Sequence, residues 1–265
     1  MRGMGYFDRE TAVRATGDGS FAAYVSGAWS IGTNPNGGYA VQPVLRAMAE
    51  LTGRPDPASL TVHYLRPAIG DAEGEVRVAV VRAGRRATYA SGVLLQEGVE
   101  RLTVAAVLTD LTDAASDAPD PGLQVPAPAI PPPTACRDRR ELDQGVELPL
   151  LSRVEVRVSR DGTAGAVVDG WIRFVDDAPP CAPGLVLFAD AFPPAVHAVV
   201  EQVGWVPTLE LTVHVRRRPA PGWVQARLEC DDVTGGWMIE TGTLWDETGA
   251  VVARSRQLGM ILPHP

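Results

Sequence analysis

The chain has 265 residues, of which 45% are hydrophobic, which is enough for one large core or two small ones. Its formal net charge of −8 argues against a nucleic-acid-binding protein, because such proteins carry a basic surface. The amino terminus, MRGMGYFDRE, lacks the apolar core of a signal peptide, and no later run approaches the ~20 apolar residues of a membrane span. These features predict a cytoplasmic protein that does not enter a membrane.

The first half of the chain predicts one helix followed by strands. Apolar residues recur at helical spacing from Gly37 to Leu51, and Gly53 follows as a stop signal. Turn residues Gly84 and Gly98 separate the later runs, as antiparallel hairpins require. The predicted strands are Ser59 to Leu65, Glu75 to Arg82, Ala87 to Gln96 and Arg101 to Leu108.

The stretch from Thr112 to about Pro149 is rich in Pro, Ala and Asp and has no apolar periodicity. It predicts an extended linker that crosses the surface. The basic cluster from Arg137 to Arg140 predicts solvated surface charge, with a phosphorylated ligand as the alternative.

The second half repeats the pattern of the first. A strand pair precedes a helix, which we expect from Gly184 to Val203, and four strands follow it. The expected strands are Ser152 to Val158, Ala164 to Phe174, Thr208 to Val215, Trp223 to Asp231, Trp237 to Trp245 and Val251 to Ile261.

Matched residues recur at a constant offset between the halves. Thr61-Val62-His63 returns as Thr212-Val213-His214, and 212 − 61 = 151. The same offset relates Pro43 to Pro194, Leu60 to Leu211 and Gly98 to Gly249. Together these matches indicate an internal duplication. A helix and an antiparallel meander, present twice, predict an α+β fold in which each sheet wraps a helix.

Asp190 is the first candidate functional residue. It is the only ionisable residue between Pro183 and Val196, where burial would raise its pKa and make it a stronger base when ionised. An ordinary alternative is a helix cap, because Ala191-Phe-Pro-Pro suits a helix that restarts near Pro193. The residue at the same place in the first half is Tyr39, so a cap needed by the fold is not repeated there.

Thr208 and Gln257 are further candidates. Strict alternation places Thr208 on the polar face of its strand, with Glu210 and Thr212, unless a bulge intervenes. Gln257 shares a face with small and apolar residues, so we expect it to be buried and to need hydrogen-bond partners. A strand-edge threonine and a structural glutamine are the ordinary alternatives.

The opening of the first helix, Asn36-Gly37-Gly38, could present backbone N–H groups to a substrate carbonyl or a phosphate. Tyr39 follows and could donate a hydrogen bond, so these four residues are the candidate substrate-binding set. Close packing is the ordinary explanation of such glycines. His63 and His214 occupy equivalent repeat positions, which favours a structural or interface role for both.

Cys136, Cys181 and Cys230 are odd in number and far apart, which fits neither a disulfide framework nor a paired metal site. We expect reduced cysteines and no metal.

The ordered set of short motifs resembles the double hotdog acyl-CoA thioesterases of the bacterial acyl-CoA thioesterase II kind. The resemblance rests on Asn36-Gly37-Gly38, on the segment from Ser59 to Pro67, on Phe188-Ala-Asp190, on Pro207-Thr208 and on the segment from Gly249 to Gln257. It covers nearly the whole chain outside the linker, and implies hotdog repeats at residues 1–111 and 150–265 joined by a linker at 112–149.

The resemblance also implies an activity and its residues. In that family an Asp on the second helix, a Thr at the start of the next strand and a Gln on the last strand form the hydrolytic site. These roles fall on Asp190, Thr208 and Gln257. The expected substrate is a thioester of coenzyme A or of a carrier protein, no cofactor is implied, and self-association is expected by family resemblance only.

Two other classes remain open at this stage. One is a hotdog hydratase or dehydratase that acts on an acyl thioester. The other is a non-catalytic acyl-thioester-binding protein, or a biosynthetic enzyme that reuses the same cavity.

Overall fold

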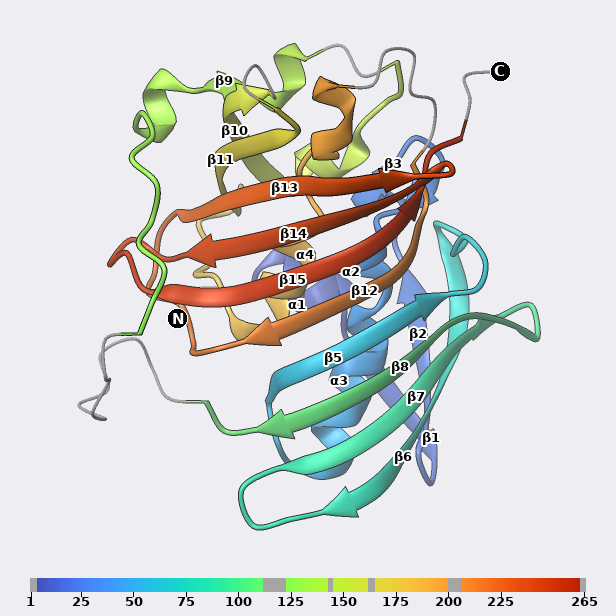
Figure 1. The fold of residues 1–265 in the computed structure, drawn as a ribbon. Coiled ribbons are helices and arrows are strands. Elements are labelled where there is room, and N and C mark those ends of the chain that lie inside the picture. Colours follow the sequence, from blue (N-terminus) through green and yellow to red (C-terminus); the bar gives the residue numbers. More distant parts are fainter. Residues whose placement is uncertain (1–3, 112–122, 143–144, 162–164, 200–205, 263–265) are drawn as a thin grey trace.

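The computed structural model describes residues 4–111, 123–142, 145–161, 165–199 and 206–262. Within these residues, antiparallel strands form one large sheet in the order β1-β2-β6-β7-β8-β5-β12-β15-β14-β13-β11-β10-β9 (Figure 1). The first-half strands of this sheet are β1 (Val13–Gly17), β2 (Ser20–Val25), β5 (Asp56–Tyr64), β6 (Ala72–Ala83), β7 (Thr88–Gln96) and β8 (Val99–Thr109). The others are β9 (Arg137–Asp138), β10 (Val154–Asp161), β11 (Val167–Phe174), β12 (Thr208–Val215), β13 (Val224–Thr234), β14 (Trp237–Trp245) and β15 (Val251–Met260). A separate short pair, β3 (Ser30–Ile31) and β4 (Asn34–Pro35), leads into the helices.

Four α-helices lie in the described residues: α1 (Tyr6–Glu10), α2 (Gly37–Ala40), α3 (Gln42–Thr52) and α4 (Ala182–Phe188). The predicted first helix corresponds to α2 and α3. Asn36 caps α2, because its side chain accepts a hydrogen bond from the Tyr39 backbone N–H at 3.0 Å. Gly53 ends α3 with a φ of 66°, which is the left-handed conformation that glycine adopts without strain. The buried face of α3 packs on β6 and β7 (Figure 1).

The second predicted helix, from Gly184 to Val203, is wrong in its extent. The helix α4 ends at Phe188, and a 3-10 turn from Ala195 to Ala198 follows. The last turn of α4 closes early, with the Asp190 N–H donating to Leu187 O at 3.0 Å, and Pro193 and Pro194 prevent a helix from continuing through their positions because proline has no N–H to donate and restricts the residue before it. Residues 200–203 of the prediction lie outside the described part of the chain.

The two halves meet where β5 pairs with β12 in the middle of the sheet (Figure 1). Thr61 lies opposite Thr212, and their hydroxyl oxygens are 2.9 Å apart. These are the residues that the offset of 151 relates, so each half presents the same position to the other. The neighbouring pairs Leu60–Ala106 and Leu211–Gln257 keep the same offset.

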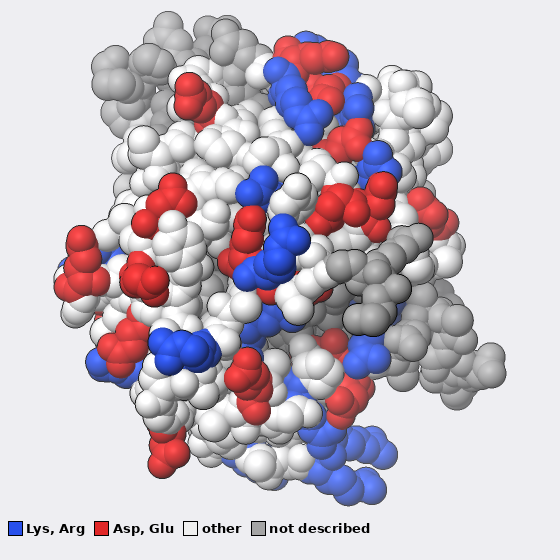
Figure 2. All heavy atoms as spheres, turned by 180° about the vertical axis from the view of Figure 1, so that it is seen from behind, with Lys and Arg blue, Asp and Glu red and all other residues white. Residues whose placement is uncertain are grey.

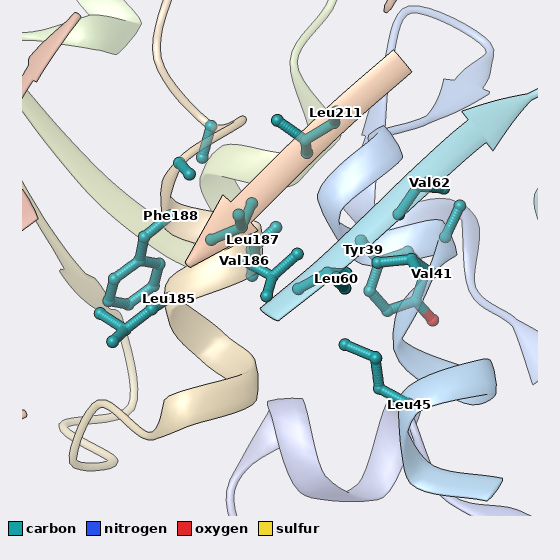
Figure 3. Packing of buried hydrophobic residues seen from close by; sticks show 14 of the residues in the cluster. Tyr39, Val41, Leu45, Leu60, Val62, Leu185, Val186, Leu187, Phe188 and Leu211 are labelled. Carbon is teal, nitrogen blue, oxygen red and sulfur yellow. The ribbon is translucent and has the colours of Figure 1, made fainter. Parts of the chain in front are cut away.

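One buried apolar cluster runs through both halves. Side chains from α2 and α3 lie beside those of α4, under Leu60 and Val62 of β5 and Leu211 of β12 (Figure 3). Tyr39 is fully buried in this cluster and stacks on Trp29 with a centroid distance of 5.0 Å.

The described part of the predicted linker lies against the second-half strands. Its backbone carbonyls accept side-chain hydrogen bonds from three strands. Trp245 Nε1 donates to Val125 O at 2.8 Å, Gln225 Nε2 donates to Pro128 O at 2.7 Å, and Trp171 Nε1 donates to Pro131 O at 2.9 Å. Beyond these contacts the segment enters β9, which pairs with β10.

Acidic and basic side chains are interspersed on the face of the molecule seen in Figure 2. Over the described residues visible there, charges of one sign do not gather into an extended patch. No helix in the described residues is long and apolar enough to cross a membrane.

Candidate active site

A cavity of about 660 Å³ lies where the helices of both halves meet the central strands. Asp190, Thr208 and Gln257 all line it, although they are far apart in sequence. Asn36 and Gly37 line it from the first half. The fold therefore brings the three candidate catalytic residues and part of the candidate binding loop to one space.

Asp190 follows α4 and is held by the first half of the chain. Asn36 Nδ2 donates to its backbone carbonyl at 2.7 Å and to its carboxylate Oδ2 at 2.9 Å. The Gly38 backbone N–H donates to the same Oδ2 at 2.9 Å. Both carboxylate hydrogen bonds go to Oδ2, so Oδ1 is the oxygen that these described partners leave for a ligand or a water.

The surroundings of Asp190 shift its protonation. The residue is half-buried and lines the cavity. Burial raises the pKa of Asp190 to about 6, while the Gly38 N–H, the Asn36 amide and the Arg139 guanidinium act in the opposite direction. A carboxylate with this pKa is ionised at neutral pH and is a stronger base than an exposed one.

The helix-cap alternative for Asp190 takes an unexpected form. Its carboxylate does not cap the 3-10 turn from Ala195 to Ala198, for which no side-chain cap is found. Instead it accepts from Gly38 at the start of α2, in the other half of the chain. The residue thus ties the two halves together at the wall of the cavity.

Thr208 reaches the cavity because of a β-bulge. Thr208 pairs with Gly259 and Glu210 pairs with Leu258, so Leu209 is an extra residue on β12. Gly259 lies two residues after Gln257, on the same face of β15. The bulge therefore turns Thr208 away from the polar face that strict alternation predicts and towards the face of Gln257.

Gln257 lies on the inward face of β15. Its side chain is buried, as are Ala253 and Ser255, whereas Arg254 and Arg256 are exposed. This alternation confirms the predicted burial of the amide. Its cross-strand neighbours are Leu211 on β12 and Glu240 on β14.

The candidate binding loop requires a correction. The Tyr39 side chain does not line the cavity: it is buried against Trp29, donates to Glu10 O at 2.8 Å and accepts from the Ser26 N–H at 2.9 Å. Gly38 N–H and the Asn36 amide hold Asp190, so these two donors serve the carboxylate. Tyr39 is the third residue of α2, and at this place in the helix its side chain points into the core (Figure 3).

Glycines 37 and 38 are explained by close approach. A Cβ on Gly38 would lie 2.7 Å from Val186 O and 2.8 Å from Leu187 Cα, which are backbone atoms of α4. A Cβ on Gly37 would lie 2.9 Å from the Tyr64 ring and 3.1 Å from Asp190 Oδ2. The loop can hold Asp190 only because these positions carry no side chain.

The cavity also contains Glu240, Arg139 and Tyr64, which the sequence reasoning did not select. Glu240 alternates with buried Met238 and Gly242 on β14, and Tyr64 alternates with buried Leu60 and Val62 on β5. Alternation is therefore the signal that could have found both. Arg139 belongs to the segment predicted as linker, and no local pattern marks it as buried.

These residues make the cavity wall partly polar. Burial raises the pKa of Glu240 to about 7, and its Oε2 accepts from the Ala195 N–H at 2.6 Å. Arg139 is almost fully buried and donates to the carbonyl of Ala191. The predicted solvation of this arginine is wrong, because the segment after Asp138 turns inward to the cavity.

The histidines are divided between the cavity and the surface. His197 lines the cavity, and burial together with Arg139 lowers its pKa. His63 and His214 are exposed on β5 and β12 and do not line it. No group of three or more metal-binding side chains occurs among the residues that the structure describes.

Family comparisons agree with this architecture. The family model described as acyl-CoA thioesterase N-terminal domain matches residues 25–109. The model described as acyl-CoA thioesterase C-terminal domain matches residues 121–261, which is more than half of the chain. The chain belongs to the acyl-CoA thioesterase family.

Solved structures place the chain in the hotdog fold. A candidate thioesterase II from Thermobifida fusca is 32% identical, with a TM-score of 0.86 and 98% of each chain covered. A hotdog-fold protein of unknown function from Alicyclobacillus acidocaldarius is 21% identical, with a TM-score of 0.84 and coverage of 99% of this chain and 100% of that one. The second likeness shows the fold alone.

A curated relative offers less information. An uncharacterized protein of Mycobacterium tuberculosis is 33% identical over 121 residues, which are 45% of this chain. The matched region spans 40% of the length of that relative.

Proposed function

We propose that this protein hydrolyses an acyl thioester of coenzyme A to the free acid and coenzyme A. The observation that carries the proposal is the carboxylate of Asp190, which has a raised pKa and lines one cavity with Thr208 and Gln257. Family membership supports a thioester substrate.

In the proposed mechanism, Asp190 Oδ1 accepts a proton from a water molecule that the Thr208 hydroxyl and the Gln257 amide hold. The water oxygen attacks the thioester carbonyl carbon and forms a tetrahedral intermediate. Its collapse breaks the C–S bond, and the proton passes from Asp190 to the sulfur of the leaving thiolate. Asp190 is then ionised again, so one water is consumed and no other reactant is needed.

The loop from Asn36 to Gly38 has a positioning role in this mechanism. Its two hydrogen bonds fix Oδ2 and so orient Oδ1 of the same carboxylate. They also favour the ionised form of the base. The loop comes from the first half of the chain and the base from the second, so the proposed site needs both.

We also propose that residues 1–111 and 150–265 are two hotdog repeats, each with a sheet around a central helix, joined by a linker at 112–149. The conserved offset in the β5–β8 and β12–β15 pairings supports this division. So does the bulge at Ala58 on β5, which is the repeat partner of the bulge at Leu209.

One observation favours a second candidate, a hydratase or dehydratase. His197 lines the same cavity as Asp190, and its lowered pKa keeps the imidazole neutral and able to accept a proton. A thioester bound there could then lose or gain water next to the carbonyl.

A panel of short, medium, long and aromatic acyl-CoA substrates would test both candidates. Released free thiol would report hydrolysis, while mass analysis of the acyl group would report hydration of an enoyl-CoA or dehydration of a hydroxyacyl-CoA. The same acyl groups on a carrier protein would identify the preferred carrier. We expect the wild type to release thiol from at least one acyl-CoA. The Asp190→Asn variant should not release it. A product that retains its thioester would instead favour the second candidate, and binding without turnover would indicate a non-catalytic protein.

A further inference from the structure

The hydroxyl of Tyr64 is buried and has no hydrogen-bond partner among the described residues. Tyr64 is the last residue of β5, and it shares the inward face of that strand with Leu60 and Val62. A buried hydroxyl without a partner is unfavourable, so natural proteins rarely keep one without a reason. The other buried tyrosine hydroxyl near this site, that of Tyr39, has both a donor and an acceptor partner.

The position of this hydroxyl relates it to the candidate base. The Tyr64 hydroxyl and Asp190 Oδ2 lie 3.0 Å and 3.1 Å from the point that a Cβ on Gly37 would occupy. Tyr64, Gly37 and Asp190 all line the cavity. The hydroxyl and the carboxylate therefore both lie against Gly37, on the side where another residue would carry its side chain.

Two of the donors beside the base already hold its carboxylate. Gly38 N–H and Asn36 Nδ2 both donate to Asp190. A thioester carbonyl that approaches Asp190 needs a donor of its own, because negative charge develops on its oxygen as water adds. Tyr64 has an uncommitted O–H at this place.

Tyr64 is also in the protonation state that a donor requires. Burial raises the pKa of Tyr64 well above its ordinary value, and the nearby carboxylates of Asp190 and Glu210 raise it further. The hydroxyl therefore keeps its proton at neutral pH, where Asp190 is ionised.

We propose that the Tyr64 hydroxyl donates a hydrogen bond to the carbonyl oxygen of the bound acyl thioester and stabilises the oxyanion formed from it. This inference rests on the proposed thioesterase function and adds a first-half residue to the reacting groups. It assigns the substrate carbonyl to the part of the cavity that Tyr64 and Gly37 line.

Tyr64→Phe is the primary test, because it removes the hydroxyl and keeps the ring. We expect kcat to fall by roughly 10- to 100-fold, with little change in KM. This loss of kcat is somewhat smaller than that typical of a sole oxyanion donor. The melting temperature should stay the same or rise, since a buried hydroxyl without a partner is lost. A merely structural tyrosine would show the opposite pair of results. Tyr89→Phe, on an exposed side chain, is the matched control.

Binding of two non-hydrolysable analogues separates this inference from the proposed function. An S-(2-oxoalkyl)-CoA retains a carbonyl, whereas an S-alkyl-CoA of equal length has none. We expect Tyr64→Phe to weaken binding of the first by about fivefold or more, the value of one hydrogen bond, and to leave the second unchanged. Equal effects on both analogues would overturn the role of Tyr64 even if the wild type is an active thioesterase. A selective effect on the ketone with no wild-type turnover would instead reject hydrolysis while supporting the carbonyl contact.

Gly37→Ala provides a second variant should Tyr64→Phe fold poorly. Its methyl group would press against the Tyr64 ring and the Asp190 carboxylate and displace the hydroxyl. We expect it to weaken ketone binding more than S-alkyl-CoA binding, and an equal loss of both would count against the proposed position of the carbonyl.

Discussion

Asp190 shows at the residue scale how a costly group is retained in an apolar segment. Its neighbours in sequence, Leu187, Phe188 and Phe192, are buried, and desolvation is the largest influence on its pKa. Two donors from the first half offset only part of this cost. The ionised form of Asp190 is therefore less stable, relative to its protonated form, than that of an exposed carboxylate. Such a cost is typical of groups kept for function.

The variant Asp190→Asn should lose at least about 100-fold in turnover, because the amide preserves volume but cannot accept the proton. Stability should not fall at pH 7.5. The folded-state pKa is raised from 3.8 to about 6, so the cost of the buried charge grows between these pH values and is complete above them. An amide removes that cost. Denaturation curves and thiol-release rates would test both results, with exposed Asp18→Asn as the control. Near wild-type turnover by a folded variant would defeat the mechanism.

The pH dependence of turnover provides a second test of the base. We expect kcat/KM to fall tenfold per pH unit below about pH 6, because protonated Asp190 cannot accept a proton. Glu240 also titrates in this cavity, with a pKa of about 7. Glu240 is mostly protonated at pH 6, so the Glu240→Gln variant resembles the wild type there. The acidic limb of its kcat/KM profile, where activity falls, should therefore stay near pH 6. If the limb disappears or moves by more than about one unit in Glu240→Gln, then Glu240 and not Asp190 controls it.

The residues of the site differ in how far the sequence reveals them. Asp190 stands out because it is a lone charge in an apolar run, and Gln257 because it is an amide on a small-residue face. Glu240 lies on the inward face of an alternating strand, yet alternation alone does not say that this face borders a cavity. Arg139 gives no signal, since only tertiary structure shows that its segment turns inward.

At the scale of elements, the site depends on two local irregularities. The extra residue at Leu209 turns Thr208 to the inward face of β12, and the short helix α2 crosses α4 at Gly38. A bulge follows from pairing between distant strands, so the sequence of β12 alone cannot predict it. The same limit applies to α4, where the apolar run continues past Phe188 but the helix ends there in a turn closed by the Asp190 N–H on Leu187 O.

The close approach of α2 and α4 makes Gly38→Ala a sharp test. The new Cβ would contact two backbone atoms of α4 at 2.8 Å or less, and backbone cannot rotate aside as a side chain can. We expect a loss of about 1–3 kcal/mol in the free energy of unfolding. Turnover should also fall, because Gly38 N–H holds Asp190.

Gly17→Ala is the matched control for this variant. No heavy atom lies within 4 Å of the position of its added Cβ, and its φ is not in the left-handed region. Unfolding in urea and turnover would be measured for both variants. Equal behaviour of Gly38→Ala and Gly17→Ala would show that the helix crossing does not constrain the site.

At the scale of the whole molecule, the two proposed repeats differ at the candidate catalytic positions. The pairing of β5 with β12 places equivalent residues opposite each other, as at Thr61 and Thr212. The candidate catalytic residues break this equivalence. The first-half partners of Asp190, Thr208 and Gln257 are Tyr39, Pro57 and Ala106, at the same offset of 151.

This inequality predicts different results for equivalent substitutions. Gln257→Ala should reduce turnover by about 10-fold or more, because it removes the amide that orients the attacking water. Ala106→Val, at the partner position, should act through packing instead. Ala106 is buried, and adding methyl groups to a filled core costs about 1–3 kcal/mol of stability without removing a reacting group.

Turnover measured on the folded fraction of each variant would decide between a single site and two. We expect a large loss only for Gln257→Ala, because the first-half partners of the other two candidate residues offer no reacting group. The ring of Tyr39 is buried and stacked on Trp29. Pro57 has no polar side chain. Wild-type activity in Gln257→Ala would exclude the proposed second-half site. A comparable loss in well-folded Ala106→Val would mean that the first half also contributes reacting groups near β8, and that duplication has preserved two sites.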